Sequence, residues 1–237
     1  MSALAVVFPG QGSQKRGMGE DFVRDCPEAA SVFEEASDAL GFDVKSLCFA
    51  DDSRLHLTEF TQPAILTTEI AMFRAMVARW GLEATHFGGH SLGEYSALVA
   101  AGTIPLAQAV CLVRFRGRLM QEVVPVGRGA MLAVMAKKLN PRFLRDVIGV
   151  LRVDLANWNS TNQIVLSGPA EDIETVHERM RRLMDEPDSG PGFLIKPLAV
   201  SAPFHSWMMA PMEWEFRKRV EQLMVDWDCS AASKVVS

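Results

Sequence analysis

The sequence predicts an α/β protein in which a small domain is inserted into a larger domain built on a parallel sheet. The chain opens with an apolar run, residues 4–8, of the kind that forms a strand buried on both faces of such a sheet. In the middle of the chain, strand and helix patterns follow one another in the order β-α-β-β-α-β, which is typical of a ferredoxin-like unit. We therefore expect a large domain over residues 1–127 and 201–237, and an inserted ferredoxin-like domain over residues 128–200.

The elements of the large domain follow from apolar periodicity and from the residues that end each run. A glycine-rich loop, residues 9–14, follows the first strand. One long helical pattern has an apolar face made of Leu66, Ile70, Phe73, Val77 and Trp80. The expected strands span residues 4–8, 85–88 and 234–237, and the expected helices span residues 27–40, 66–80, 94–101, 105–123 and 212–224.

The inserted domain is predicted from shorter patterns of the same two kinds. Its strands are expected at residues 130–135, 153–156, 163–167 and 193–200, and its helices at residues 141–151 and 170–184. The segment 185–192 is rich in Asp, Pro and Gly, and we expect it to form a mobile surface loop.

Composition argues against several classes of protein. The 237 residues suit one large domain or two modest ones, and the net charge of −5 argues against binding to nucleic acid. No apolar stretch approaches the roughly 20 residues of a membrane span, and Pro9 ends the first apolar run too early for a signal peptide. The four cysteines are spaced too widely for a zinc site or a disulfide framework. We therefore expect a cytoplasmic protein with no metal, no membrane and no nucleic-acid partner.

The segment Gly89–Gly93 carries the clearest sign of chemistry. It reads Gly-His-Ser-Leu-Gly, which fits the G-x-S-x-G turn that joins a strand to a helix and exposes a serine Oγ. Small residues flank Ser91 because the turn is sharp. The alternative interpretation is a glycine-rich turn with a helix-capping serine. The strand and helix patterns around the turn favour catalysis and an α/β-hydrolase-like large domain.

A nucleophilic serine needs a base, because its hydroxyl is a poor nucleophile at neutral pH. The histidines of the chain are His56, His86, His90, His177 and His205. His177 lies in a charged helix, His56 lies in a polar loop, and His90 adjoins the serine on a sharp turn. His205 is the best candidate, because it follows the last strand of the inserted domain and comes late after the serine, as in the chain order of α/β-hydrolases.

Several blocks of sequence, spread in order along nearly the whole chain, carry a family resemblance. They are Phe-Pro-Gly-Gln-Gly-Ser-Gln at 8–14, Thr-Gln-Pro-Ala-Ile at 61–65, Gly-His-Ser-Leu-Gly-Glu-Tyr at 89–95, Arg-Gly-Arg-Leu-Met-Gln at 116–121, Asn-Trp-Asn-Ser at 157–160 with Gln-Ile-Val-Leu-Ser-Gly at 163–168, and Val-Ser-Ala-Pro-Phe-His-Ser at 200–206. Together these blocks resemble the malonyl-CoA:acyl carrier protein transacylases, including the free-standing acyltransferases that serve polyketide synthases.

The resemblance implies a malonyl transferase that works through an ester on Ser91. The serine would attack the thioester of malonyl-CoA, and His205 would take its proton and later return it to the leaving thiol. The backbone N–H groups of Gln11 and Leu92 would form the oxyanion hole. The malonyl group would then pass to the phosphopantetheine thiol of an acyl carrier protein, in a monomeric enzyme with no metal and no bound cofactor.

The resemblance also implies which residues select the substrate. Arg116 would bind the malonyl carboxylate through two parallel hydrogen bonds, whereas Arg114 and Arg118 nearby are expected to be solvated. Phe204 would crowd an α-methyl branch and so favour malonyl over methylmalonyl groups. The supporting polar residues would be Gln62 and Asn159.

Alternatives remain open from the sequence. Family members continue beyond the position of Ser237 with a segment that completes the sheet and supplies a backbone carbonyl that orients the histidine. We therefore expect these 237 residues to be part of a longer chain, the alternative being a naturally shortened relative without that segment. An acyl hydrolase of the same family, acting on acyl carrier proteins, is a second hypothesis, although such hydrolases tend to lose the arginine found here at Arg116. A truncated, non-catalytic module that docks carrier proteins is a third. The pathway, fatty acid or polyketide synthesis, is not decided by the sequence.

Overall fold

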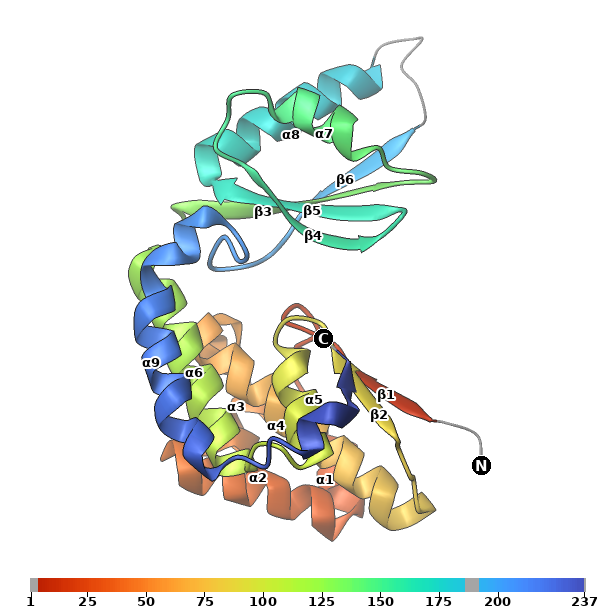
Figure 1. Ribbon diagram of the computed structural model, residues 1–237, viewed down its shortest axis with the longest axis vertical. Coiled ribbons are helices and arrows are strands. Elements are labelled where there is room, and N and C mark those ends of the chain that lie inside the picture. The colour runs from red at the N-terminus through yellow and green to blue at the C-terminus, as the bar shows by residue number, and fades with distance from the viewer. Residues whose placement is uncertain (1–3, 186–191, 237) are drawn as a thin grey trace. The chain divides into compact units, whose positions relative to one another are not determined.

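The computed structural model describes residues 4–185 and 192–236 and divides into two compact units (Figure 1). The first unit combines Met1–Arg118 with Glu215–Ser237, and the second unit is Leu119–Trp214. The first unit is therefore discontinuous in sequence. The predicted bounds of the inserted domain, residues 128–200, stay a prediction, because a compact unit is not shown to fold by itself.

The first unit contains a parallel sheet of strands β1 (Ala5–Phe8), β2 (His86–Gly89) and β7 (Val235–Val236), in the order β1-β2-β7. Phe8 of β1 lies beside Gly89 of β2. Because the carboxyl ends of parallel strands share one edge of a sheet, the loop after β1 and the turn after β2 emerge together. The predicted strand pattern is confirmed in this unit.

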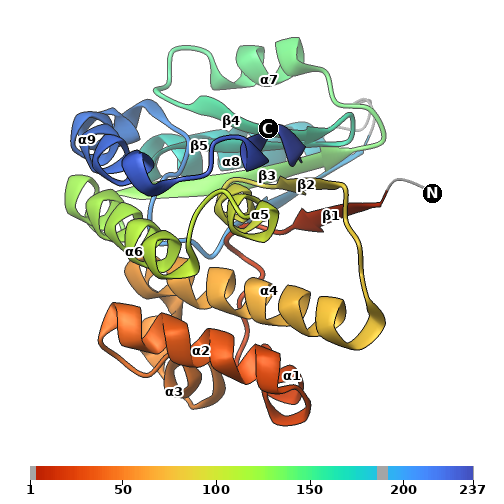
Figure 2. The same ribbon diagram turned by 60° about the horizontal axis from the view of Figure 1, so that its bottom comes forward.

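Helices make up most of the rest of this unit. In chain order they are α1 (Glu20–Asp25), α2 (Pro27–Leu40), α3 (Val44–Phe49), α4 (Thr58–Trp80), α5 (Gly93–Ala101), α6 (Leu106–Val123) and α9 (Glu213–Leu223). Helices α6 and α9 cross the division between the two units. Figure 2 shows α5 between the sheet and α4. Phe73 of α4 packs edge-on against Phe8 and Phe87 of the strands, which closes the core on this face. None of the described helices combines the length and the apolar character that a membrane crossing needs.

The second unit contains an antiparallel sheet in the order β4-β5-β3-β6. Its elements, in chain order, are β3 (Gly129–Ala136), α7 (Pro141–Ile148), β4 (Asp154–Ser160), β5 (Gln163–Pro169), α8 (Ala170–Asp185) and β6 (Phe193–Pro197). Both helices pack on one face of the sheet, over buried residues such as Leu132 and Leu166 (Figure 1). This confirms the predicted β-α-β-β-α-β order and the ferredoxin-like arrangement.

The start of α4 was predicted wrongly. The helix begins at Thr58 rather than residue 66, and Pro63 lies inside it. Proline usually breaks a helix, because it lacks an N–H and its ring clashes with the carbonyl four residues before it, but the buried residues on both sides of Pro63 hold α4 in its helical conformation. Two short helices, α1 and α3, were not predicted, since six residues are too few to show a helical period.

Some element ends in the second unit also differ from the prediction. Helix α7 ends at Ile148 rather than residue 151, because Gly149 follows with a φ of 61°. Strand β4 continues to Ser160, well past residue 156, because the outermost strand of the sheet tolerates polar side chains. Strand β6 ends at Pro197 rather than residue 200. Most of the predicted loop 185–192 lies outside the described residues.

Candidate active site

Ser91 occupies a strained turn between β2 and α5. Its φ is 53°, in the left-handed region that non-glycine residues rarely adopt, and within the described chain only one other non-glycine residue, His205, has a positive φ. The strand ends at Gly89 and the helix begins at Gly93. The strand–turn–helix context that the motif requires is therefore present.

The two glycines of the turn allow its tight packing. A Cβ on Gly89 would lie 2.0 Å from the carbonyl carbon of Gly93, and a Cβ on Gly93 would lie 2.2 Å from the carbonyl oxygen of Phe8. Neither neighbour can yield, since both are backbone atoms. The turn is thus pressed against itself and against the end of β1, which explains why glycine stands at both positions.

The loop after β1 contacts the same turn. A Cβ on Gly10 would lie 2.5 Å from the carbonyl oxygen of His90, so this glycine also permits a close backbone approach. The next residue, Gln11, donates a 3.0 Å hydrogen bond from Nε2 to Oγ1 of Thr58 at the start of α4. Within the described chain, the backbone N–H groups of Gln11 and Leu92 donate no hydrogen bond. Both are therefore available to an oxyanion.

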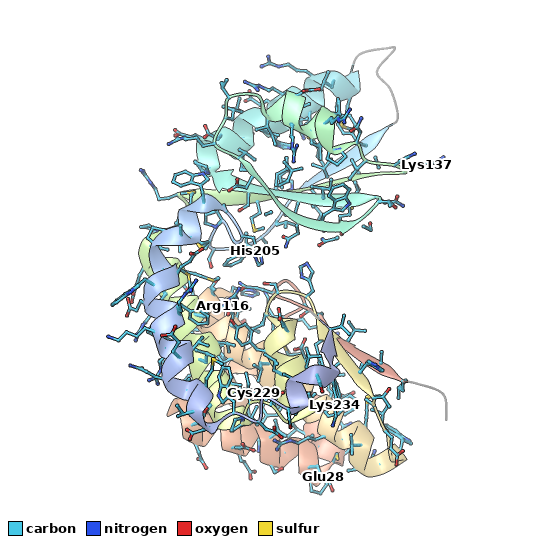
Figure 3. The ribbon with its side chains drawn as sticks, viewed as in Figure 1. Glu28, Arg116, Lys137, His205, Cys229 and Lys234 are labelled. Atoms are coloured by element: carbon cyan, nitrogen blue, oxygen red, sulfur yellow. The ribbon has the colours of Figure 1, made fainter. Side chains whose placement is uncertain are left out.

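Arg116 lies on α6 in the first unit (Figure 3). Its Nη1 donates a 3.0 Å hydrogen bond to Oε1 of Gln62, which is fully buried in α4. Its Cζ lies 5.7 Å from the centre of the Tyr95 ring on α5. Burial lowers the pKa of Arg116, while Tyr95 and Glu94 raise it, and a guanidinium stays charged at any physiological pH. Residues of three helices thus surround the half-buried guanidinium of Arg116. The contact with Tyr95 is not predicted from the sequence.

The expectation that Arg114 is solvated is wrong. Its side chain is half-buried, with Nε 3.1 Å from Oε1 of Glu59 and Nη1 donating to the carbonyl of Leu40. Its Cζ also lies 5.2 Å from the ring of Phe42. Arg118 is exposed, and its Cζ lies 5.3 Å from the ring of Phe115. Helix α6 therefore carries a structural arginine, Arg114, in addition to Arg116, and the two have different partners.

His205 lies in the second unit, in the turn that follows β6 (Figure 3). Its φ is 57°, and its side chain is exposed. Around it, Ser206 Oγ donates to the carbonyl of Pro203 at 2.8 Å, and the N–H of Trp207 donates to Oδ2 of Asp154 at 2.7 Å. The turn is therefore held on both sides while the imidazole is open to solvent.

The remaining predicted site residues lie in the second unit as well. Phe204 is 8% exposed and directly precedes His205 in the same turn. Asn159 is exposed on β4, where its Nδ2 donates to Oε1 of Gln163 at 3.2 Å. Among the predicted residues, the structure joins Arg116 and Gln62 by a direct bond. In the first unit lie Ser91, Leu92, Gln11, Arg116 and Gln62, and in the second lie His205, Phe204 and Asn159.

The cysteines are free thiols. Cys26 and Cys48 are buried, Cys111 is half-buried and Cys229 is exposed. Burial raises the pKa of Cys48 to about 12, so this thiol is inert at neutral pH. In the described residues, no three His, Cys, Asp or Glu side chains are placed to share a metal ion.

The G-x-S-x-G turn after a parallel strand, with a ferredoxin-like unit inserted in the chain, defines a two-unit α/β protein. A family model described as the acyl transferase domain matches residues 5–225. The chain belongs to this acyl transferase family, as the sequence blocks predicted.

Two curated relatives show how close the similarity is. The malonyl CoA-acyl carrier protein transacylase of Bacillus subtilis (strain 168) is 42% identical over 217 residues, which cover 89% of this chain and 65% of the relative. The polyketide biosynthesis malonyl CoA-acyl carrier protein transacylase BaeC of Bacillus velezensis is 35% identical over 216 residues, which cover 91% of this chain and 71% of the relative. A further Bacillus subtilis transacylase is covered over 54% of its length. The chain thus spans less than two thirds of two of its curated relatives.

Solved structures agree with the family. The malonyl CoA-acyl carrier protein transacylase of Coxiella burnetii has a TM-score of 0.84 and 37% identity, and the match covers 93% of this chain and 69% of that one. A type II polyketide malonyl-transacylase in complex with its acyl-carrier protein has a TM-score of 0.84 and 38% identity, with 94% and 71% covered. At these identities the likeness extends to sequence as well as fold.

Proposed function

We propose that the chain is the core of an acyl carrier protein S-malonyltransferase, which moves a malonyl group from malonyl-CoA to the phosphopantetheine thiol of an acyl carrier protein. The observation that carries this proposal is the turn at Ser91, whose φ of 53° is imposed by glycines packed against backbone atoms. Such strain persists only where the surrounding structure imposes it, and it clusters at active sites. The names of the relatives, malonyl CoA-acyl carrier protein transacylases of which one belongs to polyketide biosynthesis, support the substrate class.

The first half of the reaction forms an ester on Ser91. Its Oγ attacks the thioester carbonyl carbon of malonyl-CoA, and its proton passes to the imidazole of His205. The negative oxygen of the tetrahedral intermediate accepts hydrogen bonds from the N–H groups of Gln11 and Leu92. The intermediate collapses with cleavage of the C–S bond, and His205 returns the proton to the CoA sulfur. No bound cofactor or metal takes part in this proposal.

The second half runs in reverse with a different thiol. The phosphopantetheine thiol of the carrier protein gives its proton to His205 and attacks the ester carbonyl. Collapse of the second intermediate breaks the C–O bond, and the proton returns to Ser91 Oγ. The product is malonyl-carrier protein. A monomeric, cytoplasmic enzyme is part of the proposal.

Arg116 binds the malonyl carboxylate. A guanidinium has five N–H donors, and the hydrogen bond to Gln62 fixes one end of the group and leaves donors for a carboxylate. Phe204 crowds an α-methyl branch, and Asn159 and Gln62 support the site. These roles are carried over from the family resemblance.

A hydrolase that clears acyl groups from carrier proteins is the second candidate. It needs no carboxylate clamp, whereas Arg116 is half-buried beside two helices and bonded to a buried amide. This arrangement favours a substrate with a free carboxylate, and hence transfer of malonyl groups.

Intact-protein mass spectrometry after mixing with malonyl-CoA tests the proposal. We expect a stable malonyl adduct that peptide mapping assigns to Ser91 and that Ser91→Ala abolishes. Ser31→Ala, at an exposed serine of α2, is the matched control and should leave the adduct unchanged. Rapid release of malonic acid would favour the hydrolase, and the absence of any adduct would favour a docking module without catalysis.

A further inference from the structure

A buried polar contact joins α4 to α5, the helix that begins directly after the serine turn. Glu69 of α4 is 9% exposed, and Ser96 of α5 is fully buried. Ser96 Oγ donates a short hydrogen bond to Oε2 of Glu69. The two helices pack against each other around this pair. A carboxyl group is an unusual choice for such a place, because acidic side chains are seldom buried without a charged partner.

The second carboxyl oxygen of Glu69 has no partner. Oε1 is buried and accepts no hydrogen bond in the described part of the chain. Burial raises the pKa of Glu69 to about 8, and the bond from Ser96 acts in the opposite direction. The carboxyl group is therefore mainly protonated at neutral pH. Its neutral form costs less to bury than its charged form, because no donor is present at Oε1 to compensate a charge.

A cavity of about 510 Å³ borders Glu69 on the side of the loop after β1. Pro9 and Ser13 of that loop line it, together with Thr68 and Glu69 of α4. The charged residues that line this cavity come from the loop and from α1, and they are Lys15, Glu20, Asp21 and Arg24. An ionised Glu69 would be drawn towards water and cations in this cavity and away from Ser96.

We propose that Glu69 is a positioning residue: in its protonated form it holds α5, through Ser96, in the place that presents Ser91 and the Leu92 N–H for the reaction. Two observations connect the pair to the reaction. Ser96 lies on the helix that carries the turn, and α4 also carries Gln62, which holds Arg116. The tie between α4 and α5 thus sets the nucleophile against the carboxylate clamp. Glu69 itself touches no reacting atom, and the inference rests on the proposed function.

The first test compares isosteric and truncated variants by their kinetics. Glu69→Gln keeps a neutral acceptor for Ser96, so we expect kcat within about twofold of the parent at neutral pH. Glu69→Ala removes the tie, and a misplaced nucleophile should lower kcat by about tenfold with little change in KM. Glu34→Gln, the same change at a carboxylate with 68% of its side chain exposed, is the matched control and should change neither constant.

The pH profile separates positioning from simple packing. The parent enzyme should lose kcat as the pH rises through the pKa of Glu69, about 8, and this loss should be absent in Glu69→Gln. An alkaline loss of the same size in both proteins would overturn the proposal. So would a Glu69→Gln variant as slow as Glu69→Ala.

Hydrogen exchange of the α5 backbone tests the tie without any need for activity. Exchange of the N–H groups over Gly93–Ala101, corrected for its intrinsic pH dependence, should speed up in Glu69→Ala and in the parent above the pKa of Glu69, but not in Glu69→Gln. If Ser91 takes up no malonyl group, the proposed function fails while this measurement still reports on Glu69. If neither Glu69→Ala nor the pH changes the rate of hydrogen exchange in α5, the positioning role is refuted even in an active enzyme.

Discussion

Replacing Arg116 by alanine should change which acyl group the enzyme transfers. Malonyl has a free carboxylate and acetyl has none. A hydrogen bond to a charged group contributes about 1.5–3 kcal/mol, so loss of the clamp should lower kcat/KM for malonyl-CoA by about 10–100-fold. Acetyl transfer should be unchanged or improved, because no guanidinium is then left facing an uncharged group. The assay is radiolabelled or mass-resolved transfer from malonyl-CoA and acetyl-CoA in competition.

The structure predicts a side effect of this substitution that the experiment has to separate. Gln62 is fully buried, and Arg116→Ala removes the donor to its Oε1. An unsatisfied buried acceptor costs about 1–3 kcal/mol of stability. The melting temperature of Arg116→Ala reports this cost separately from the change in malonyl preference, which the competition assay measures.

Arg118→Ala serves as the control for charge on α6. Its side chain is exposed on the same helix, so the substitution removes the same charge without touching the clamp. The reasoning is refuted if Arg116→Ala lowers malonyl and acetyl transfer equally, or if Arg118→Ala shifts the preference as far.

Further predictions concern the turn, the buried carboxyl and the pocket. Gly93→Ala would place a Cβ 2.2 Å from the carbonyl oxygen of Phe8, so labelling of Ser91 should fall by about 100-fold, whereas Gly192→Ala, in open space, should keep it. Glu69 has a raised pKa, about 8 against 4.5 in the unfolded chain. As the pH rises between these values, the free energy of unfolding of the parent should fall by up to about 1.4 kcal/mol per pH unit relative to that of Glu69→Gln. Urea titrations in which the parent becomes more stable relative to the variant over this range would contradict the prediction. Phe204→Ser should raise methylmalonyl over malonyl transfer by about tenfold in competition assays, and an unchanged ratio would remove Phe204 from the specificity site.

Local rules made part of the fold predictable. The G-x-S-x-G turn is specified within five residues, because glycine is required wherever a Cβ would meet backbone atoms, and the structure confirms its strand–turn–helix context. The β-α-β-β-α-β order could be predicted for a similar reason, because apolar residues repeat with one period in strands and with another in helices. The first turns of α4 were missed because Pro63 obeys a local rule, helix breaking, that the tertiary structure overrides.

Contacts between distant elements were less accessible to sequence reasoning. The bond between Arg116 and Gln62 joins α6 to α4, and no spacing in the sequence announces it. The contact between Glu69 and Ser96, in contrast, is indicated by one feature of the sequence. Glu69 stands three residues after Leu66 and four before Phe73, on the apolar face of its helix, where an acid is out of place. An acidic residue on the apolar face of a helix indicates that its side chain is buried and contacts a polar group of another element.

The backbone strain at His205 leads to a last prediction. Glycines flank Ser91 and permit its turn, but His205 adopts a φ of 57° between Phe204 and Ser206. The turn around His205 is held instead by a local bond from Ser206 to Pro203 and by a bond from Trp207 to the distant Asp154. A left-handed φ costs an L-residue about 1–2 kcal/mol and glycine nearly nothing. His205→Gly should therefore unfold at a higher temperature than His205→Ala, by the equivalent of about 1 kcal/mol, although both variants lose the base and with it malonyl transfer. Equal melting of the two variants would show that the turn relaxes without the imidazole, and the strain would then belong to the histidine's own contacts rather than to the fold.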